Sequence, residues 1–443
     1  MKLNRVAIYS CAVVLSAVGV AACGDDDNEQ AGGGDGQTAA GGKTLTVYSS
    51  LPLQGASRPQ TTAMVNGIKL ALERANNKAG DFKIRYQSLD DSTAQAGTWT
   101  PEATAQTARK AAQDDNVGAY IGEFNSGASA VSMPILNEAF VPQISPANTA
   151  VGLTSDAPGA DKGEPEKYYP TGKRHYVRIV PKDTIQGAAL ATVMQQDGCK
   201  KIYIANDKEV YGAGLSRNIE NSVRELGMQI TGNNGIDPKA PNYRAVAAGA
   251  ERRGTDCFVF SGITANGAVQ LFKDFAAALP NAKLYGPDGV AESGFADPDE
   301  GGIPSNVAKR VKVTVATLDP ESYPEEGQQF FESFEQKFNE PNPDPYAIYG
   351  YEAMRLALDA IAASDGTKES VVEALFNTKD RESVLGKYSI DDNGDTTLTT
   401  YGVYTIDQQG ELVFNKSVEA KAEPGGDAAG GAAGPAEGGQ ADE

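Results

Sequence analysis

The stretch KIYIANDKEVYGAGLSRNIE, residues 201–220, could carry chemistry because an apolar run leads into two glycines and a helical pattern. A strand, a glycine-rich turn and a helix can together cradle a phosphate group. A dinucleotide fingerprint would need a third glycine where this chain has Arg217, and the P-loop signature is absent. Tyr211 also stands where a phosphate loop has no bulky side chain. The stretch therefore predicts a helix that begins close to an aromatic ring guarding a pocket.

Side chains suited to catalysis are scarce. The one histidine, His175, is the single candidate base for a Ser-His-Asp or Cys-His arrangement. It precedes a strand pattern, whereas ligands of parallel sheets bind where the strands end. Asp90 and Asp91 would point to opposite faces of a strand, so we expect turn or capping roles for them. We expect no enzymatic reaction, no cofactor and no metal site.

The beginning of the chain is typical of an export signal. Lys2 and Arg5 precede an apolar run that ends in Val-Ala-Ala directly before Cys23. This ending is similar to the lipobox of bacterial lipoproteins, which implies removal of residues 1–22 and acylation of Cys23. An ordinary signal without lipidation is the alternative. More than one acyl chain would give stable anchoring to a membrane.

The other cysteines sort by position. Cys11 would leave with the signal, and Cys199 and Cys257 would remain in the exported protein, where a disulfide is expected. Both lie just before apolar strand patterns. If those strands are neighbours, the two Cα atoms fall within the roughly 4.4–6.8 Å that a disulfide spans. We predict this bond.

Two segments have the composition of disordered chain. Residues 23–43 and 422–443 are rich in glycine, alanine and acidic residues and lack aromatic and branched aliphatic side chains. They cannot bury enough apolar surface to offset the entropy of ordering, so we predict a tether and a tail. The net charge is -20, and five acidic residues lie in each segment. The acidic charge that remains argues against a nucleic-acid partner, which requires a basic surface.

Strand patterns alternate with helix patterns between these segments. This order predicts an α/β fold with parallel sheets flanked by helices, and residues 44–421 are too many for one typical core. Ligands of such sheets bind at the carboxyl ends of the strands. The polar segments expected there are Ser49–Gln54, Asp90–Ser92, Glu123–Ser126, Ser145–Thr149, Asn206–Tyr211, Ser261–Thr264 and Gly286–Asp288.

The order of several segments resembles one family. These segments are VYSSLPLQG, NGIKLALERANNKAG, YIGEFNSGAS, PQISPANT, YVRIVPKDTIQG, KIYIANDKEVYGAGL, LYGPDGV and DPYAIYGYEAMRLALDAI. They resemble the branched-chain amino acid ABC transporter substrate-binding proteins, which are type I periplasmic binding proteins with the leucine/isoleucine/valine receptor fold. The resemblance covers about residues 44–418.

The resemblance implies two Rossmann-like lobes that are joined by three hinge crossovers and clamp the ligand between them. The crossovers would fall near residues 176–180, 313–317 and 387–390. The first lobe would then comprise residues 44–176 and 314–388, and the second lobe residues 177–313 and 389–421.

The resemblance also implies a site for an α-amino acid. Ser126 and Thr149 match the hydroxyls that bind the ligand carboxylate, and Ala147 matches a carbonyl that accepts from the ammonium. Asp288 matches the acidic partner of that ammonium, and Tyr211 the aromatic residue that covers the ligand. The other expected lining residues are Phe124, Asn125 and Asn148. Taken singly, Ser126 and Thr149 could cap helices, and Asp288 could belong to a turn.

One wall departs from the leucine-binding members of this family. They carry aromatic residues where this chain has Ile263–Asn266, so amides, urea and aromatic acids are alternative ligands to a branched-chain or related amino acid. We expect a monomeric solute-binding protein, lipid-anchored to the outer face of the cytoplasmic membrane, with an ABC permease as its partner. A ligand-sensing receptor module of the same fold is the alternative.

Overall fold

The computed structural model describes residues 42–419. The predicted signal (1–22), Cys23, the predicted tail (422–443) and all but the last two residues of the predicted tether (23–43) lie outside them. Across the described residues, no helix combines the length and the apolar character needed to cross a membrane.

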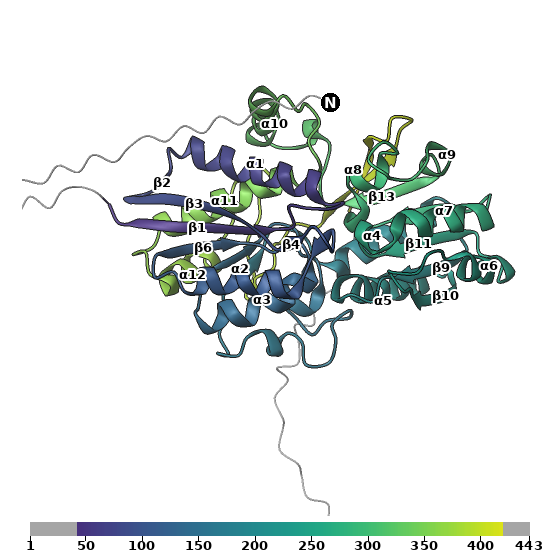
Figure 1. Ribbon diagram of the computed structural model, residues 1–443, viewed down its shortest axis with the longest axis horizontal. Helices are drawn as coiled ribbons and strands as arrows, with labels where there is room; N and C mark the ends of the chain where they lie inside the picture. Colours follow the sequence, from purple (N-terminus) through teal and green to yellow (C-terminus); the bar gives the residue numbers. More distant parts are fainter. Residues whose placement is uncertain (1–41, 420–443) are drawn as a thin grey trace, which may run out of the picture. The chain divides into compact units, whose positions relative to one another are not determined.

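A six-stranded sheet is built mainly from the first third of the described chain (Figure 1). All of its neighbouring strands are parallel except the short β2, which pairs antiparallel with β3. The chain runs from β1 to β3 on one side and then crosses back over β1 to β6 on its other side, so the strand order reverses between β1 and β6. In spatial order the strands are β2 (Lys78–Ala79), β3 (Phe82–Asp90), β1 (Thr44–Leu51), β6 (Val117–Ile121), β7 (Gln143–Ser145) and β8 (Tyr176–Arg178).

Helices cover both faces of this sheet. The connection from β1 to β3 runs one way and those from β3 to β6 and from β6 to β7 run the other, so right-handed crossovers place their helices on opposite faces. Accordingly, α1 (Arg58–Arg74) packs with α11 (Ala347–Ala362), and α2 (Pro101–Ala112) packs with α3 (Ser126–Glu138). The same part of the fold includes α10 (Glu325–Phe338) and α12 (Lys368–Phe376).

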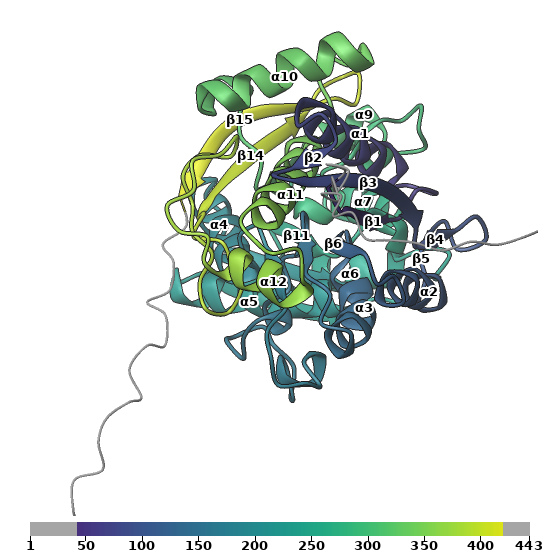
Figure 2. The same cartoon turned by 90° about the vertical axis from the view of Figure 1, so that its left-hand side faces the viewer.

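A seven-stranded sheet is the second large sheet of the fold. Its first five strands are parallel, as the sequence predicted, and β14 pairs antiparallel with β13 and β15 antiparallel with β14 at one edge. Figure 2 shows these two yellow strands side by side. An antiparallel edge on an otherwise parallel sheet is common. Antiparallel neighbours such as β14 and β15 can be joined by a short hairpin turn. In spatial order the strands are β10 (Gln229–Gly235), β9 (Lys201–Asn206), β11 (Cys257–Ser261), β12 (Lys283–Gly286), β13 (Val311–Val315), β14 (Thr400–Ile406) and β15 (Leu412–Glu419).

The helices that flank the seven-stranded sheet are also placed by right-handed crossover connections. The connections place α5 and α6 on opposite faces, with α4 packed on α5 and α7 packed on α6. These elements are α4 (Asp183–Gln196), α5 (Val210–Glu225), α6 (Arg244–Arg252) and α7 (Ala268–Ala278). Short elements complete the described chain: β4 (Ser92–Thr93), β5 (Thr98–Trp99), α8 (Ser293–Ala296), α9 (Ser305–Ala308) and 3-10 turns at Val151–Leu153, Glu166–Tyr168, Thr264–Asn266, Asp288–Val290 and Pro320–Ser322.

The chain passes between the two sheets three times: after β8, after β13, and before β14. The strand β8 pairs with β7 through Arg178, so the first passage follows that residue. The parallel order, the helices on both faces and these passages confirm the predicted α/β class with two Rossmann-like sheets.

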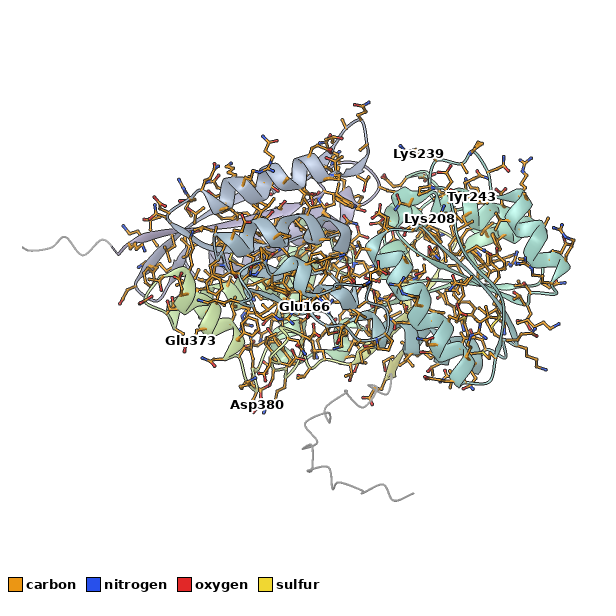
Figure 3. All side chains as sticks on the ribbon, turned by 90° about the horizontal axis from the view of Figure 1, so that it is seen from below. Glu166, Lys208, Lys239, Tyr243, Glu373 and Asp380 are labelled. Carbon is orange, nitrogen blue, oxygen red and sulfur yellow. A yellow bond between two sulfur atoms is a disulfide. The ribbon has the colours of Figure 1, made fainter. Side chains whose placement is uncertain are left out.

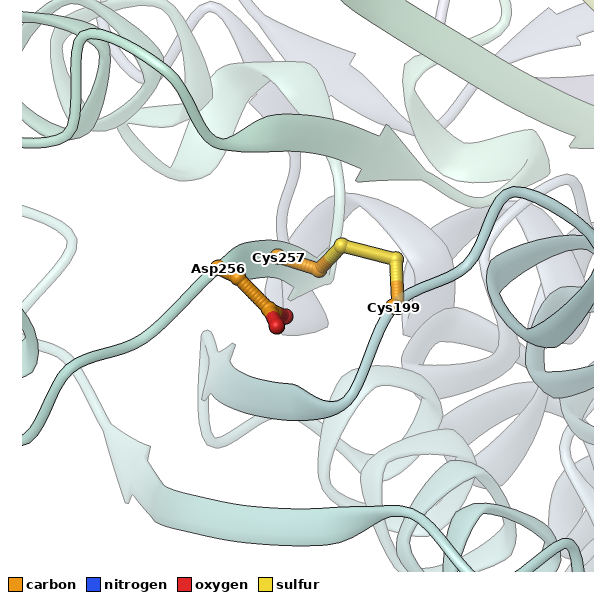
Figure 4. A group of neighbouring side chains, drawn as sticks. All are labelled: Cys199, Asp256 and Cys257. Carbon is orange, nitrogen blue, oxygen red and sulfur yellow. A yellow bond between two sulfur atoms is a disulfide. The ribbon is translucent and has the colours of Figure 1, made fainter.

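A disulfide joins Cys199 to Cys257, with 5.8 Å between the Cα atoms (Figure 4). It forms where β9 and β11, which are neighbours, begin. The Asp256 carboxylate lies beside the two sulfurs, but it accepts hydrogen bonds from the backbone amides of Lys200 and Lys201. With both sulfurs in a disulfide, this group supplies no thiolate to a metal and instead ties two strand ends together.

Candidate ligand-binding site

The carboxyl ends of the two sets of parallel strands meet around one small cavity. In one sheet the strand order reverses between β1 and β6, and in the other between β9 and β11, which is where open α/β sheets bind ligands. The cavity is about 20 Å³, room for roughly one water molecule. Its lining residues are Phe124, Asn125, Ser126, Ala147, Thr149, Glu209, Tyr211, Ile263, Asp288, Gly289 and Tyr346.

Seven of the eight residues predicted as ligand contacts line this cavity. The eighth, Asn148, is buried and turned to the framework. Its side-chain amide donates to the carbonyl of Phe124 at 2.9 Å, and its oxygen accepts from the Tyr176 hydroxyl at 3.1 Å. Asn148 therefore holds the loop after β6 against the loop after β7.

The first turn of α3 faces the cavity. Ser126 begins the helix, and its hydroxyl accepts a hydrogen bond from the amide of Ala150 at 3.3 Å. Asn125 precedes the helix without capping it through its side chain. The amides of a first helical turn have no partner within the helix, and they carry the positive end of the helix dipole. Together with the hydroxyls of Ser126 and Thr149, this turn can bind a carboxylate.

Asp288 is the charged group at the centre of the site and is 5% exposed. One carboxylate oxygen accepts from Gln186 Nε2 and from the Tyr211 hydroxyl, both at 2.5 Å, and the other accepts from the Tyr346 hydroxyl at 2.8 Å. Burial raises the pKa of this carboxyl, although the three hydrogen bonds favour its ionised form. All three donors are neutral, so a cationic group would complement this carboxylate better than they do.

Tyr211 reaches Asp288 because α5 starts unusually close to the sheet. A Cβ on Gly212 would lie 2.5 Å from the carbonyl oxygen of Ser261, so only glycine permits this approach. Burial and the Asp288 charge both raise the pKa of Tyr211, which keeps its phenol protonated as a donor. The glycines of the stretch 201–220 therefore position a tyrosine over a carboxylate, in agreement with the prediction of an aromatic ring at a pocket.

A second buried carboxyl lies behind the first. Asp183 begins α4 and is fully buried, and neither of its carboxylate oxygens has a hydrogen-bond partner among the described residues. Burial, followed by the negative charge of Asp288, raises its pKa well above the usual value. The raised pKa favours the neutral form of Asp183, and this residue does not line the cavity, so Asp288 is the carboxylate that faces a ligand there.

Sequence reasoning missed Gln186, Gly289 and Tyr346, whereas Glu209 and Ile263 lie in the strand-end segments Asn206–Tyr211 and Ser261–Thr264 that it expected at the site. Gln186 and Tyr346 lie inside segments that carried the family resemblance, DTIQG and DPYAIYG, but neither follows a strand of the sheet. Gln186 lies on α4, and Tyr346 directly precedes α11. A search restricted to strand ends could not find them.

His175 lies away from the cavity, at the amino end of β8. It is fully buried, with Nδ1 2.8 Å from the side-chain nitrogen of Asn137. Burial, and then the charge of Arg174, lowers its pKa to about 3, so this imidazole stays neutral. Within residues 42–419, the cavity lining contains no histidine or cysteine that could act as a base or nucleophile.

Comparison with known proteins supplies the family. Residues 46–411 match the family of periplasmic binding proteins. A protein from Brucella melitensis described as Leu/Ile/Val-binding protein homolog 1 is 24% identical over 379 residues, which cover 84% of this chain and 92% of that protein.

Solved structures agree on the fold. The leucine-binding protein LivK from Thermotoga maritima superposes with a TM-score of 0.72 at 22% identity, covering 85% of this chain and 99% of that one. A solute-binding protein of an ABC transporter from Rhodopseudomonas palustris, in complex with 3,4-dihydroxybenzoic acid, superposes with a TM-score of 0.67 at 19% identity, covering 86% and 99%. Proteins of this fold thus bind both amino acids and aromatic acids.

Proposed function

The chain belongs to the periplasmic binding protein family, and we propose that it captures an α-amino acid and delivers it to an ABC permease. Members of this family bind solutes, and this chain is not an enzyme. The relatives named for leucine, isoleucine and valine support an amino acid as the ligand.

The observation that carries this proposal is the environment of Asp288. A buried carboxylate with only neutral donors gains most from a cation, and the α-ammonium of an amino acid is such a cation. The ligand carboxylate would bind opposite, at the first turn of α3 beside Ser126 and Thr149. An aromatic acid has no ammonium and would leave Asp288 uncompensated, which favours the amino acid.

Closure of the two lobes would accompany binding. Ser126 and Thr149 follow strands of the six-stranded sheet, whereas Tyr211 and Asp288 follow strands of the seven-stranded sheet. A ligand held by both sets contacts all of them only when they are close together, and this differential contact favours the closed state. Because the cavity is small, we expect the lobes to part before the ligand enters and to close around it, with the ligand ammonium taking the place of Tyr211 and Gln186 at Asp288.

The proposal extends to the location of the protein. The signal pattern over residues 1–22 and the cysteine that follows support export and acylation at Cys23, with the chain acting as a tethered monomer outside the cytoplasmic membrane. Labelling of expressing cells with radioactive palmitate should mark the wild-type protein and leave Cys23→Ala unmarked. Equal labelling of the two would contradict a lipid anchor at this cysteine.

A thermal-shift panel on the purified full chain tests the ligand class. It would include α-amino acids, short amides, urea and aromatic acids, and a ligand at a hundred times its Kd should add about 2.7 kcal/mol to the free energy of unfolding. We expect stabilisation by amino acids. Asp288→Asn should weaken their binding on the order of a hundredfold, because it removes one partner of a buried charge pair.

The exposed variant Asp299→Asn serves as the matched control and should bind as the wild type does. Stabilisation by aromatic acids alone, with no dependence on Asp288, would contradict the proposal.

A further inference from the structure

The wall of the cavity beyond Asp288 carries a second carboxylate, Glu209, and this residue bears on which amino acid would bind. The inference below rests on the proposed capture of an amino acid.

Glu209 directly precedes α5 and is partly buried. Its Oε1 accepts a hydrogen bond from Asn266 Nδ2 at 3.0 Å. Its Oε2 is directed toward the first turn of α3, where a Cβ on Gly127 would lie 3.5 Å from it. The carboxylate therefore reaches from the connection after β9 toward a helix of the other sheet.

Asn125 offers a second acceptor in the same cavity. It is 6% exposed, and its Oδ1 has no hydrogen-bond partner among residues 42–419. A buried carbonyl oxygen without a donor is costly, so this position favours a ligand that carries N–H groups. Asn125 follows a strand of the six-stranded sheet and Glu209 follows a strand of the seven-stranded sheet, and both line the same cavity.

The charged groups of the lining are all acidic. Of the eleven described residues around the cavity, two are carboxylates and none is lysine, arginine or histidine. Lys208, the neighbour of Glu209 in the chain, is exposed (labelled in Figure 3). Its aliphatic stem packs on Gly235. A ligand with a single ammonium would compensate Asp288 and leave Glu209 without a cation.

We propose that the ligand is a basic α-amino acid, with its α-ammonium at Asp288 and its side-chain cation between Glu209 and the Asn125 carbonyl oxygen. The indole of Trp99 lies beside this position, since a Cβ on Gly127 would be 2.6 Å from its Cζ2. An aromatic ring next to a carboxylate is a favourable environment for a cation. A leucine side chain would instead press apolar surface against Glu209 and strip water from its charge without compensation.

The only tryptophan of the chain is Trp99, so intrinsic fluorescence reports directly on this wall. The purified full chain would be titrated with arginine, lysine, leucine, isoleucine and citrulline, an uncharged analogue of arginine of similar shape. We expect arginine or lysine to bind at least about tenfold more tightly than leucine or citrulline, a factor of ten being about 1.4 kcal/mol.

Glu209→Gln tests the residue itself, because glutamine keeps an acceptor for Asn266 and loses the charge. The variant should bind the basic amino acid at least about tenfold more weakly and leucine no more weakly than the wild type does. Glu225→Gln, at the exposed end of the same helix, is the matched control and should leave all affinities unchanged.

The comparison of arginine with citrulline on the wild-type protein needs no variant, so it decides the question even if Glu209→Gln misfolds. Tighter binding of leucine or isoleucine than of any basic amino acid would overturn this inference and leave the proposed function standing. Failure of every amino acid to bind would overturn both.

Discussion

Two buried aspartates of this protein, Asp395 and Asp288, are almost equally inaccessible, at 4% and 5% exposed. Their pKa values nevertheless shift in opposite directions. Asp395 accepts from Arg178 Nε at 2.7 Å and from Lys182 Nζ at 3.0 Å. Burial opposes its charge, but these two cations outweigh burial and hold its pKa below the usual range. Asp288 has only neutral donors, and burial raises its pKa.

The difference distinguishes Asp395, which holds the fold together, from Asp288 in the candidate binding site. Arg178 is fully buried and also donates to the carbonyl of Ala150 and the hydroxyl of Thr154, so its charge and its donors are satisfied internally. The Asp395 pair thus ties β8 to the segment before β14 without any ligand. Asp288 has no such cation among its partners, and in the proposed function the ligand would supply it.

The largest effect is expected from Asp395→Ala. Removing this carboxylate leaves the fully buried Arg178 without its main counter-charge, and breaking a buried pair in this way costs about 3–5 kcal/mol. Urea unfolding of the full chain would measure the loss. The exposed neighbour Asp392→Ala should change stability by less than about 0.5 kcal/mol. Equal stabilities of Asp395→Ala and Asp392→Ala would contradict the role of Asp395 as the main counter-charge of Arg178.

The disulfide should also act on stability without acting on the site. Replacing Cys199 and Cys257 by alanine opens a loop of 58 residues, which should lower the free energy of unfolding by about 2–4 kcal/mol. Ligand affinity should stay within about twofold, because the disulfide lies where β9 and β11 begin and the cavity lies beyond their ends. Denaturation and ligand titration of the same samples check both points; a tenfold loss of affinity would show that framework and site are coupled.

Glu292 extends the comparison to pH. It is fully buried, with the Ser57 hydroxyl 3.4 Å away and no cation among its hydrogen-bond partners in the described chain, and burial raises its pKa to about 7. A carboxyl whose pKa is higher in the folded state stabilises the fold below its unfolded pKa, and this contribution is lost as pH rises through about 7. Stability should therefore fall between pH 5 and pH 8.

Glu292→Gln should reduce that fall by up to about 3 kcal/mol. Thermal unfolding across this pH range measures it, with the exposed Glu300→Gln as control. Part of the fall should persist in Glu292→Gln, since burial raises the pKa of Asp207 and of Asp344 to about 7 as well. A flat profile in the wild type would contradict the assignment of these carboxyls as buried without cations.

Much of the candidate site could be predicted from the sequence because most of its residues directly follow strands. Ser126, Thr149, Tyr211 and Asp288 follow strands whose apolar patterns are plain, and parallel strands bring their carboxyl ends to one edge. Asn148 shares this position and still faces the framework, since neighbouring residues on a loop can point in different directions.

What the sequence determined by itself are the local properties: the alternation of strands and helices, the absence of a catalytic base at strand ends, and the glycines that let α5 begin against the sheet. Only the tertiary structure decided which charges are paired. It brought Asp395 to Arg178, 217 residues earlier in the chain, and Tyr346 to Asp288, 58 residues earlier. Burial and charge compensation depend on such distant contacts, so the residue type of an aspartate alone does not distinguish a carboxylate that the fold pairs with cations from one that it leaves with neutral donors.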